Sequence, residues 1–272
     1  MIEPSVRAAL IELLGAPITT GELKRKPSRL TLRARGPSGT AIVKLYRSDR
    51  APRVAQRVAA LAGGPASPGV PRVLLLRPEL GLVALTDMSG VPLREAIVSG
   101  DLEGCTRAGA ALGAWHAAFA GAVPAPLREH TPARELEALE RQAASLDKAG
   151  ALRVRRAAQG LAPRWTCSTA VHRDLYEEQI LLGAETVSLI DLDDAASGPP
   201  ELDLGNLLAH LELLERRRGA PVDAAAAALL AGYGAAAAPL DDDLLDRCRR
   251  LTLLRLSCVH RDPMLHEMAL RS

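Results

Sequence analysis

The sequence predicts an α+β fold in two lobes, a small antiparallel β lobe followed by a larger helical lobe. Between residues 17 and 87, apolar and polar side chains alternate with period two and turn clusters separate the runs, as in antiparallel strands. Beyond residue 90, apolar side chains mostly recur at helical spacing. One strand-rich island, residues 170–192, interrupts the helical part. These observations predict two lobes, residues 1–89 and residues 90–272, with a hinge near 86–90.

The composition of the chain argues against some classes of binding partner. The chain has 272 residues, 48% of them hydrophobic, which is enough for one large core or two modest lobes. The net charge of +2 and the scarcity of aromatic residues favour neither nucleic acid nor an acidic membrane surface as a partner. The four cysteines form no CxxC pair, and no signal peptide or long apolar run is evident, so we expect a cytoplasmic protein without a membrane span.

In the N-terminal part, apolar positions at helical spacing over residues 2–15 predict a short amphipathic helix. Alternating runs on either side of the turn at 36–39 predict an antiparallel hairpin, and a helix from about 53 to 61 follows. Two further strands complete a small sheet that carries one helix. The predicted strands are 30–35, 40–46, 72–77 and 81–85.

The C-terminal part is expected to be mainly helical. Asp241 to Asp243 suit the N-terminal cap of the last predicted helix, because carboxylates accept hydrogen bonds from free backbone N–H groups and complement the helix dipole. The predicted helices are 102–119, 132–146, 151–160, 202–217, 222–236 and 241–260.

The island carries the residues with the strongest chemical signal. Asp174 and Gln179 lie on the loop before one apolar run, and Asp191 ends the next run after a turn at Gly183. A hairpin brings these ends together, so the three side chains can converge. Phosphoryl transfer uses such a set: a carboxylate that orients the acceptor hydroxyl, and oxygen ligands for Mg²⁺. Between residues 171 and 203 there are nine acidic residues and one basic residue, a charge excess that a bound cation would relieve.

The segments HRDLYEEQILL and LIDLDDAASGPPELDLGNLLAHL resemble the catalytic segment of the aminoglycoside phosphotransferase/choline kinase family, within the protein-kinase-like superfamily. The resemblance implies a bilobal protein-kinase-like fold with its catalytic loop in residues 171–194. It implies that Asp174 is the catalytic base and that Gln179 and Asp191 are metal ligands. It gives Asp203, at the start of a helix behind the site, a structural role.

The N-terminal half fits the family more loosely. Lys44 ends a strand, Ala-Ile-Val-Lys, that is similar to the lysine strand of kinases and would bring this lysine to the α- and β-phosphates of ATP. Ser28 lies in a Lys-Pro-Ser-Arg turn that resembles maltokinase-like members and stands where a phosphate-covering loop is expected. The hinge residues Thr86, Asp87 and Met88 would contact the adenine.

Three departures from the family pattern are visible. No GxGxxG joins the first strands, and Gln179 replaces the usual Asn. The helix glutamate that would pair with Lys44 is missing, since Gln56 and Arg57 occupy that region. Either another acid substitutes, or Lys44 is held differently, or activity is weak.

The resemblance predicts an ATP- and Mg²⁺-dependent phosphotransferase that acts on a hydroxyl of a small molecule, with an aminoglycoside, a sugar or an amino alcohol as the candidate acceptors. The alternative is a catalytically weak nucleotide-binding pseudokinase that acts as a scaffold. A protein kinase is disfavoured, because DFG and APE-type motifs are absent. Nothing in the pattern bears on oligomeric state.

Overall fold

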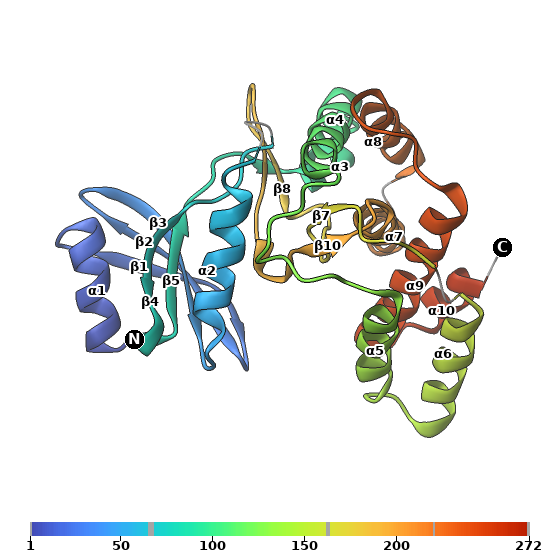
Figure 1. Cartoon of the computed structure of the whole chain (residues 1–272), viewed down its shortest axis with the longest axis horizontal. Helices are drawn as coiled ribbons and strands as arrows, with labels where there is room; N and C mark the ends of the chain where they lie inside the picture. The colour runs from blue at the N-terminus through green and yellow to red at the C-terminus, as the bar shows by residue number, and fades with distance from the viewer. Residues whose placement is uncertain (1, 65–67, 162–163, 220, 271–272) are drawn as a thin grey trace.

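The computed structural model describes residues 2–64, 68–161, 164–219 and 221–270. It confirms the predicted α+β fold: an antiparallel sheet fills the N-terminal lobe, and helices fill most of the C-terminal lobe (Figure 1). Among the described segments, no helix combines the length and apolar character needed to cross a bilayer.

The N-terminal sheet has five antiparallel strands in the order β1-β2-β3-β5-β4. Four of them match the predicted strands to within a residue or two. The first, β1, was not predicted, because every residue in it is exposed and its run of Lys, Arg and Glu shows no buried alternation. Such a polar strand suits the edge of a sheet. The strands are β1 (Thr19–Lys26), β2 (Arg29–Gly36), β3 (Gly39–Tyr46), β4 (Val73–Arg77) and β5 (Leu82–Thr86).

Two helices cover the faces of this sheet, α1 (Pro4–Leu14) and α2 (Arg50–Leu61) (Figure 1). Ala41 and Val43 are fully buried in the cluster that α1 forms with the sheet. Because successive side chains of a strand point to opposite faces, Lys44 faces away from α1 and into the cleft between the lobes.

The C-terminal lobe contains all six predicted helices, with ends that differ by a few residues. Two short helices, α3 and α10, were not predicted, because runs of seven and eight residues show too little periodicity to stand out. The helices are α3 (Leu93–Ser99), α4 (Leu102–Phe119), α5 (Pro132–Ala143), α6 (Lys148–Gly160), α7 (Glu201–Arg218), α8 (Asp223–Ala236), α9 (Asp242–His260) and α10 (Pro263–Leu270).

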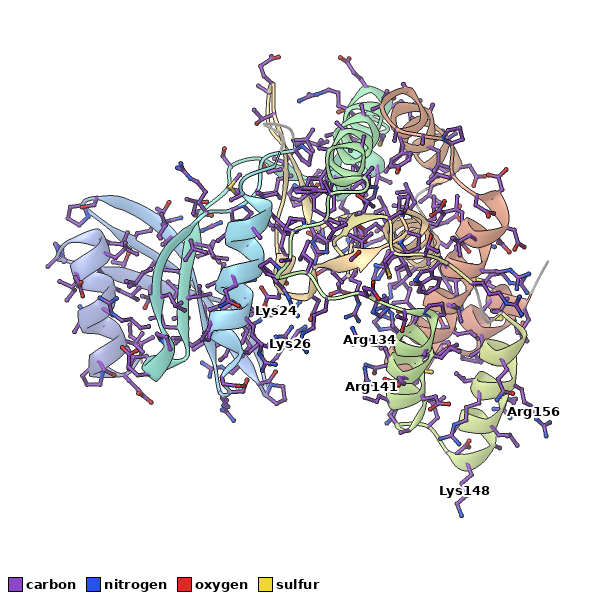
Figure 2. The ribbon with its side chains drawn as sticks, in the orientation of Figure 1. Lys24, Lys26, Arg134, Arg141, Lys148 and Arg156 are labelled. Carbon is purple, nitrogen blue, oxygen red and sulfur yellow. The ribbon has the colours of Figure 1, made fainter. Side chains whose placement is uncertain are left out.

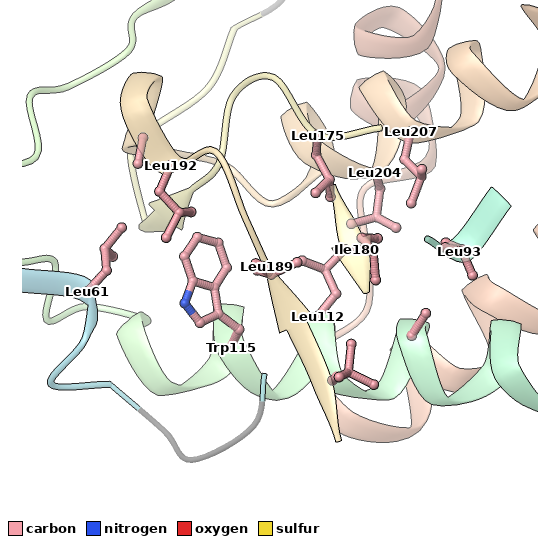
Figure 3. Close-up of a cluster of buried hydrophobic side chains, with 14 of the residues drawn as sticks. Leu61, Leu93, Leu112, Trp115, Leu175, Ile180, Leu189, Leu192, Leu204 and Leu207 are labelled. Atoms are coloured by element: carbon pink, nitrogen blue, oxygen red, sulfur yellow. The ribbon is translucent and has the colours of Figure 1, made fainter. Parts of the chain in front are cut away.

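Short strands in the C-terminal lobe carry the predicted catalytic segment. β8 and β9 form the expected hairpin, β6 pairs with β8, and β7 pairs with β10. The hairpin is buried between α4 and α7, where Ile180 and Leu189 lie among Leu112, Trp115 and Leu204 (Figure 3). This packing holds the loops at the strand ends on a rigid base. The strands are β6 (Val91–Pro92), β7 (Thr169–Val171), β8 (Ile180–Leu182), β9 (Val187–Leu189) and β10 (Ala196–Gly198).

Candidate functional site

The loop between β7 and β8 is fixed by a carboxylate from α7. Asp203, fully buried, accepts hydrogen bonds from the backbone N–H groups of His172 at 2.6 Å and Arg173 at 2.7 Å. The imidazole of His172 contacts the carbonyl oxygen of Ile190 at 2.8 Å, which ties this loop to the end of β9. His116 of α4 lies 3.2 Å from the Asp203 carboxylate. Asp203 thus organises the loop from behind.

Asp174 follows this fixed turn and is the more accessible of the candidate carboxylates, with 45% of its side chain exposed. Its Oδ1 lies 4.0 Å from a guanidinium nitrogen of Arg255 on α9. Asp174 lines a small cavity of about 90 Å³ together with Asp191 and Ser28. The structure therefore brings the two predicted aspartates to one cavity, and the β1–β2 turn covers it.

Gln179 is 3% exposed, and its amide oxygen is buried without a hydrogen-bond partner in the part of the chain that the structure describes. It lines, with Asp191, a larger cavity of about 540 Å³ between the lobes. An unpartnered amide oxygen beside a carboxylate fits Mg²⁺, which uses one or two protein oxygens and takes its other ligands from phosphates and water. No group of three His, Cys, Asp or Glu side chains that could hold a metal occurs in the described ranges.

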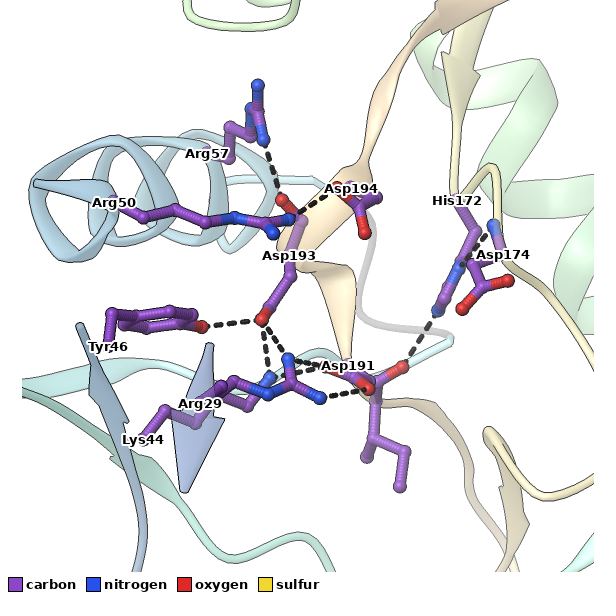
Figure 4. A network of polar contacts seen from close by, with 11 residues as sticks. Arg29, Lys44, Tyr46, Arg50, Arg57, His172, Asp174, Asp191, Asp193 and Asp194 are labelled. Carbon is purple, nitrogen blue, oxygen red and sulfur yellow. Dashed lines mark hydrogen bonds and ion pairs between the residues drawn. The ribbon is translucent and has the colours of Figure 1, made fainter. Parts of the chain in front are cut away.

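Lys44 is 3% exposed and forms ion pairs with two aspartates of the same segment, Asp191 at 2.5 Å and Asp193 (Figure 4). Asp193 is 2% exposed and also accepts hydrogen bonds from the hydroxyl of Tyr46 and the guanidinium of Arg29. A buried carboxylate thus holds the strand lysine, but it comes from the C-terminal lobe.

Helix α2 presents arginines where the family pattern has a glutamate. Arg50 forms an ion pair with Asp194 at 2.5 Å, and Arg57 donates a hydrogen bond to the backbone carbonyl of Asp193 at 2.6 Å (Figure 4). The charges are therefore exchanged relative to the expected arrangement: cations project from the helix, and the acids follow β9. The sequence does show a second aspartate, Asp193, two residues after Asp191, and no acid in residues 50–61. Only the tertiary contact shows that Asp193 takes the place of the missing helix glutamate.

The cations set the protonation state of the site. Burial raises the pKa of Asp191, but Lys44 and Arg29 outweigh burial and hold that pKa well below its usual range. Burial and the charge of Asp193 raise the pKa of Tyr46. At neutral pH Asp191 is therefore a carboxylate, and Tyr46 remains a hydroxyl that can donate its hydrogen bond.

The hinge residues Thr86, Asp87 and Met88 line the larger cavity with Lys44. Two of their side chains already have partners elsewhere. The carboxylate of Asp87 pairs with Arg33 at 2.8 Å, and the hydroxyl of Thr86 accepts a hydrogen bond from the backbone N–H of Arg72.

The larger cavity has mixed walls, since Ile42, Leu85 and Leu181 line it as well as the polar residues. Its volume and partly apolar lining suit a nucleotide-sized ligand. Ser28 does not line this cavity but lies with Asp174 in the smaller one.

Comparisons with known proteins agree with this fold and identify the family. A family described as the phosphotransferase enzyme family matches residues 27–242. The structure of macrolide 2'-phosphotransferase from Brachybacterium faecium is similar, with a TM-score of 0.62, 18% identity, and coverage of 98% of this chain and 97% of that chain. Choline kinase from Streptococcus pneumoniae has a TM-score of 0.68 and 14% identity, over 98% of this chain and 96% of that chain.

A third structure, amicoumacin kinase in complex with AMP-PNP and Ca²⁺, has a TM-score of 0.72 and 16% identity, over 99% of this chain and 92% of that chain. At such identities these structures establish the fold alone, and no curated protein sequence matches this chain. The match in sequence establishes more, because it spans residues 27–242, most of the chain. This chain therefore belongs to the phosphotransferase enzyme family.

Proposed function

We propose that this protein transfers the γ-phosphate of ATP to a hydroxyl group of a small molecule, in a reaction that depends on Mg²⁺. The observation that carries this proposal is the position of Asp191, which lines both cavities. It shares the larger one with Lys44 and Gln179, and the smaller one with Asp174. A group held at Asp191 would therefore lie between a nucleotide and an acceptor.

The larger cavity is the proposed nucleotide site, with residues 1–89 as the covering lobe and 90–272 as the catalytic lobe. The adenine lies against the hinge, Thr86 to Met88, and uses its backbone groups. Lys44 contacts the α- and β-phosphates, and its ion pair with Asp193 holds the ammonium group at the inner wall of the cleft. Ser28, in the turn above the smaller cavity, covers the transferred phosphate.

Gln179 and Asp191 are the residues that would hold Mg²⁺. The metal, when bound, neutralises charge on the transferred phosphoryl group and the leaving phosphate. The amide oxygen of Gln179 has no other partner among the described residues, and the low pKa of Asp191 keeps its carboxylate ready to bind a cation. Asp193 keeps Lys44 in place when Asp191 turns to the metal.

Asp174 is the proposed base. Its exposed carboxylate can accept the proton of an acceptor hydroxyl as the oxygen attacks phosphorus, and Arg255 lies close enough to orient it. The acceptor then lies against the C-terminal lobe. Two proteins of similar structure, a macrolide phosphotransferase and a choline kinase, support a small-molecule acceptor such as an aminoglycoside, a sugar or an amino alcohol.

The rival, a catalytically weak nucleotide-binding scaffold, drew its support from the missing helix glutamate. Asp193 supplies a buried acid to Lys44 from another segment, and this favours the enzyme. ATP turnover against a panel of sugars, amino alcohols and aminoglycosides tests the proposal. We expect at least one acceptor to raise ADP formation above the rate of ATP hydrolysis in water. No stimulation across the panel, with Mg-ATP bound, would favour the scaffold.

A further inference from the structure

A third cavity, of about 230 Å³, lies beside the catalytic loop, whose Arg173 lines it. Asp194 lines both this cavity and the smaller one, but neither Asp174 nor Asp191 lines it, so it lies beside the proposed site and outside its catalytic residues. Arginines reach it from three separate parts of the chain: helix α2, the stretch leading into and along α5, and the catalytic loop. They are Arg57, Arg128, Arg134, Arg141 and Arg173.

The acids at this cavity neutralise these arginines only in part. Asp194 is engaged by Arg50, at 2.5 Å, from outside the cavity. Glu129 and Glu137 also line it, but neither carboxylate forms an ion pair with any residue that the structure describes. The cavity is therefore left with an excess of positive charge.

Several of the guanidinium groups also lack partners. The Nε of Arg173 is buried and has no hydrogen-bond partner. Within the described ranges, the guanidinium groups of Arg128 and Arg141 form neither an ion pair nor a hydrogen bond. The buried Nε of Arg173 is costly to leave without an acceptor, and a ligand with several acceptor oxygens would satisfy it together with the exposed guanidinium groups of Arg128 and Arg141.

The arginines repel one another. Burial lowers the pKa of Arg57; Asp194 acts against this, while the charges of Arg50, Arg128 and Arg173 lower it further. Like charges held this close favour any anion that binds among them. The buried, unpartnered Nε of Arg173 and the free guanidinium groups around it are the geometric reason to expect one.

We propose that this cavity is a binding site for a phosphate-type oxyanion, either free phosphate or a phosphate group on a larger molecule. Arginine forks match the oxygens of such an anion and can bind it through paired hydrogen bonds. The anion would join α2 of the N-terminal lobe to the turn at Arg173, next to Asp174. Its binding couples the position of the lobes to the catalytic loop, which goes beyond the proposed transfer reaction.

Figure 2 shows the positions of two arginines that can be replaced to test this site. Arg141 lies on the side of α5 that faces the N-terminal sheet, whereas Arg156 projects from α6 on the outer side of the molecule. Arg128→Gln and Arg141→Gln remove single charges from the cavity without touching the residues assigned to catalysis. Arg156→Gln removes the same charge from an exposed site away from the cavity and is the matched control.

The test is calorimetric titration of the full chain with inorganic phosphate, at constant ionic strength and without metal or nucleotide. We expect saturable binding that each cavity variant weakens by about tenfold, the loss of one charged hydrogen bond, and that Arg156→Gln leaves unchanged. Absence of saturable binding, or equal binding by all variants, would overturn the proposal. Mg-ATP affinity measured on the same samples reports on the proposed function separately.

Two further measurements identify the source of the anion. If free phosphate is the ligand, it changes the rate of ATP hydrolysis by the wild type and has less effect on Arg128→Gln. If the group belongs to the acceptor, phosphorylated sugars bind more tightly than phosphate, and free phosphate only competes with them. Either result supports the site. If the cavity variants bind both phosphorylated sugars and phosphate as tightly as the wild type does, the proposed site is wrong.

Discussion

Lys44 and Asp193 form a buried ion pair that links the N-terminal sheet to the segment after β9. The lysine is 3% and the aspartate 2% exposed, so neither charge has water as an alternative partner. Tyr46 and Arg29 complete the hydrogen bonds of the aspartate. The pair thus fixes the lysine to the same segment as Asp191, and not to helix α2.

Replacing Asp193 by Asn should therefore impair both nucleotide binding and turnover. Removing one partner of a buried ion pair costs at most about 3–5 kcal/mol, and Asp191, which also pairs with Lys44, offsets part of that cost. We expect a higher KM for Mg-ATP and a lower kcat, together with a lower melting temperature. Steady-state kinetics and thermal unfolding measure these effects.

Two further variants distinguish a specific effect of Asp193→Asn from a general loss of folding stability. Asp49→Asn changes the same residue type at a site that is 87% exposed and should behave as the wild type. Asp193→Glu keeps the charge and should recover part of the ATP affinity. If Asp193→Asn stays folded with unchanged KM and kcat, Lys44 is not positioned by this pair.

Asp191→Asn should remove most of the affinity for Mg-ATP, because the bound dication loses its charged ligand. The same change leaves Lys44 and Arg29 paired with Asp193, so the fold should survive. Calorimetric titration of Mg-ATP decides this. Unchanged affinity in a folded variant would exclude Asp191 from the metal site.

Two substitutions of Gln179 distinguish a metal ligand from a residue that only packs in the core. Asn retains the amide oxygen on a shorter side chain, so Gln179→Asn should keep partial activity, whereas Gln179→Leu should lose it. Leu fills a buried apolar position well, so a purely structural role predicts the opposite order. ATPase rates at several Mg²⁺ concentrations compare the two. Wild-type activity in the Leu variant would place Gln179 outside the metal shell.

Glu135, on α5, should make folding depend on pH in the acid range. Its pKa falls from 4.5 to about 2: burial raises it, but the hydrogen bond from His130, at 2.7 Å, and the charges of Arg255 and Arg173 together outweigh burial. A lowered pKa stabilises the folded state above pH 4.5, and this stability is lost as the pH falls towards 2. Between pH 5 and pH 3 the wild type should lose about 2 kcal/mol more than Glu135→Gln does. Urea unfolding at both pH values tests this, and parallel losses would contradict it.

The sequence was sufficient for the fold and for the positions of several candidate residues. Alternation placed Lys44 on the inner face of β3, and the hairpin of β8 and β9 carried Gln179 and Asp191 to one cavity. Both follow from local periodicity, which a single sequence records directly.

The contacts between lobes were not predictable in the same way. Asp193, Arg29 and Tyr46 meet across the cleft from segments far apart in the chain, and no local pattern records which acid will face a given lysine. The edge strand β1 was missed for a related reason, because its exposed residues carry no burial signal. Contacts between distant segments, and not local secondary-structure propensity, determine these features.

Asp174 is the proposed base in phosphoryl transfer, and a single substitution tests this role. Asp174→Asn keeps the shape of the side chain but removes the proton acceptor and one charge. We expect this variant to bind Mg-ATP within a few fold of the wild type, while transfer to an acceptor or to water falls by a factor on the order of 10²–10⁴. Wild-type protein that binds Mg-ATP, yet shows neither hydrolysis above the Asp174→Asn background nor transfer across a broad acceptor panel, would contradict it.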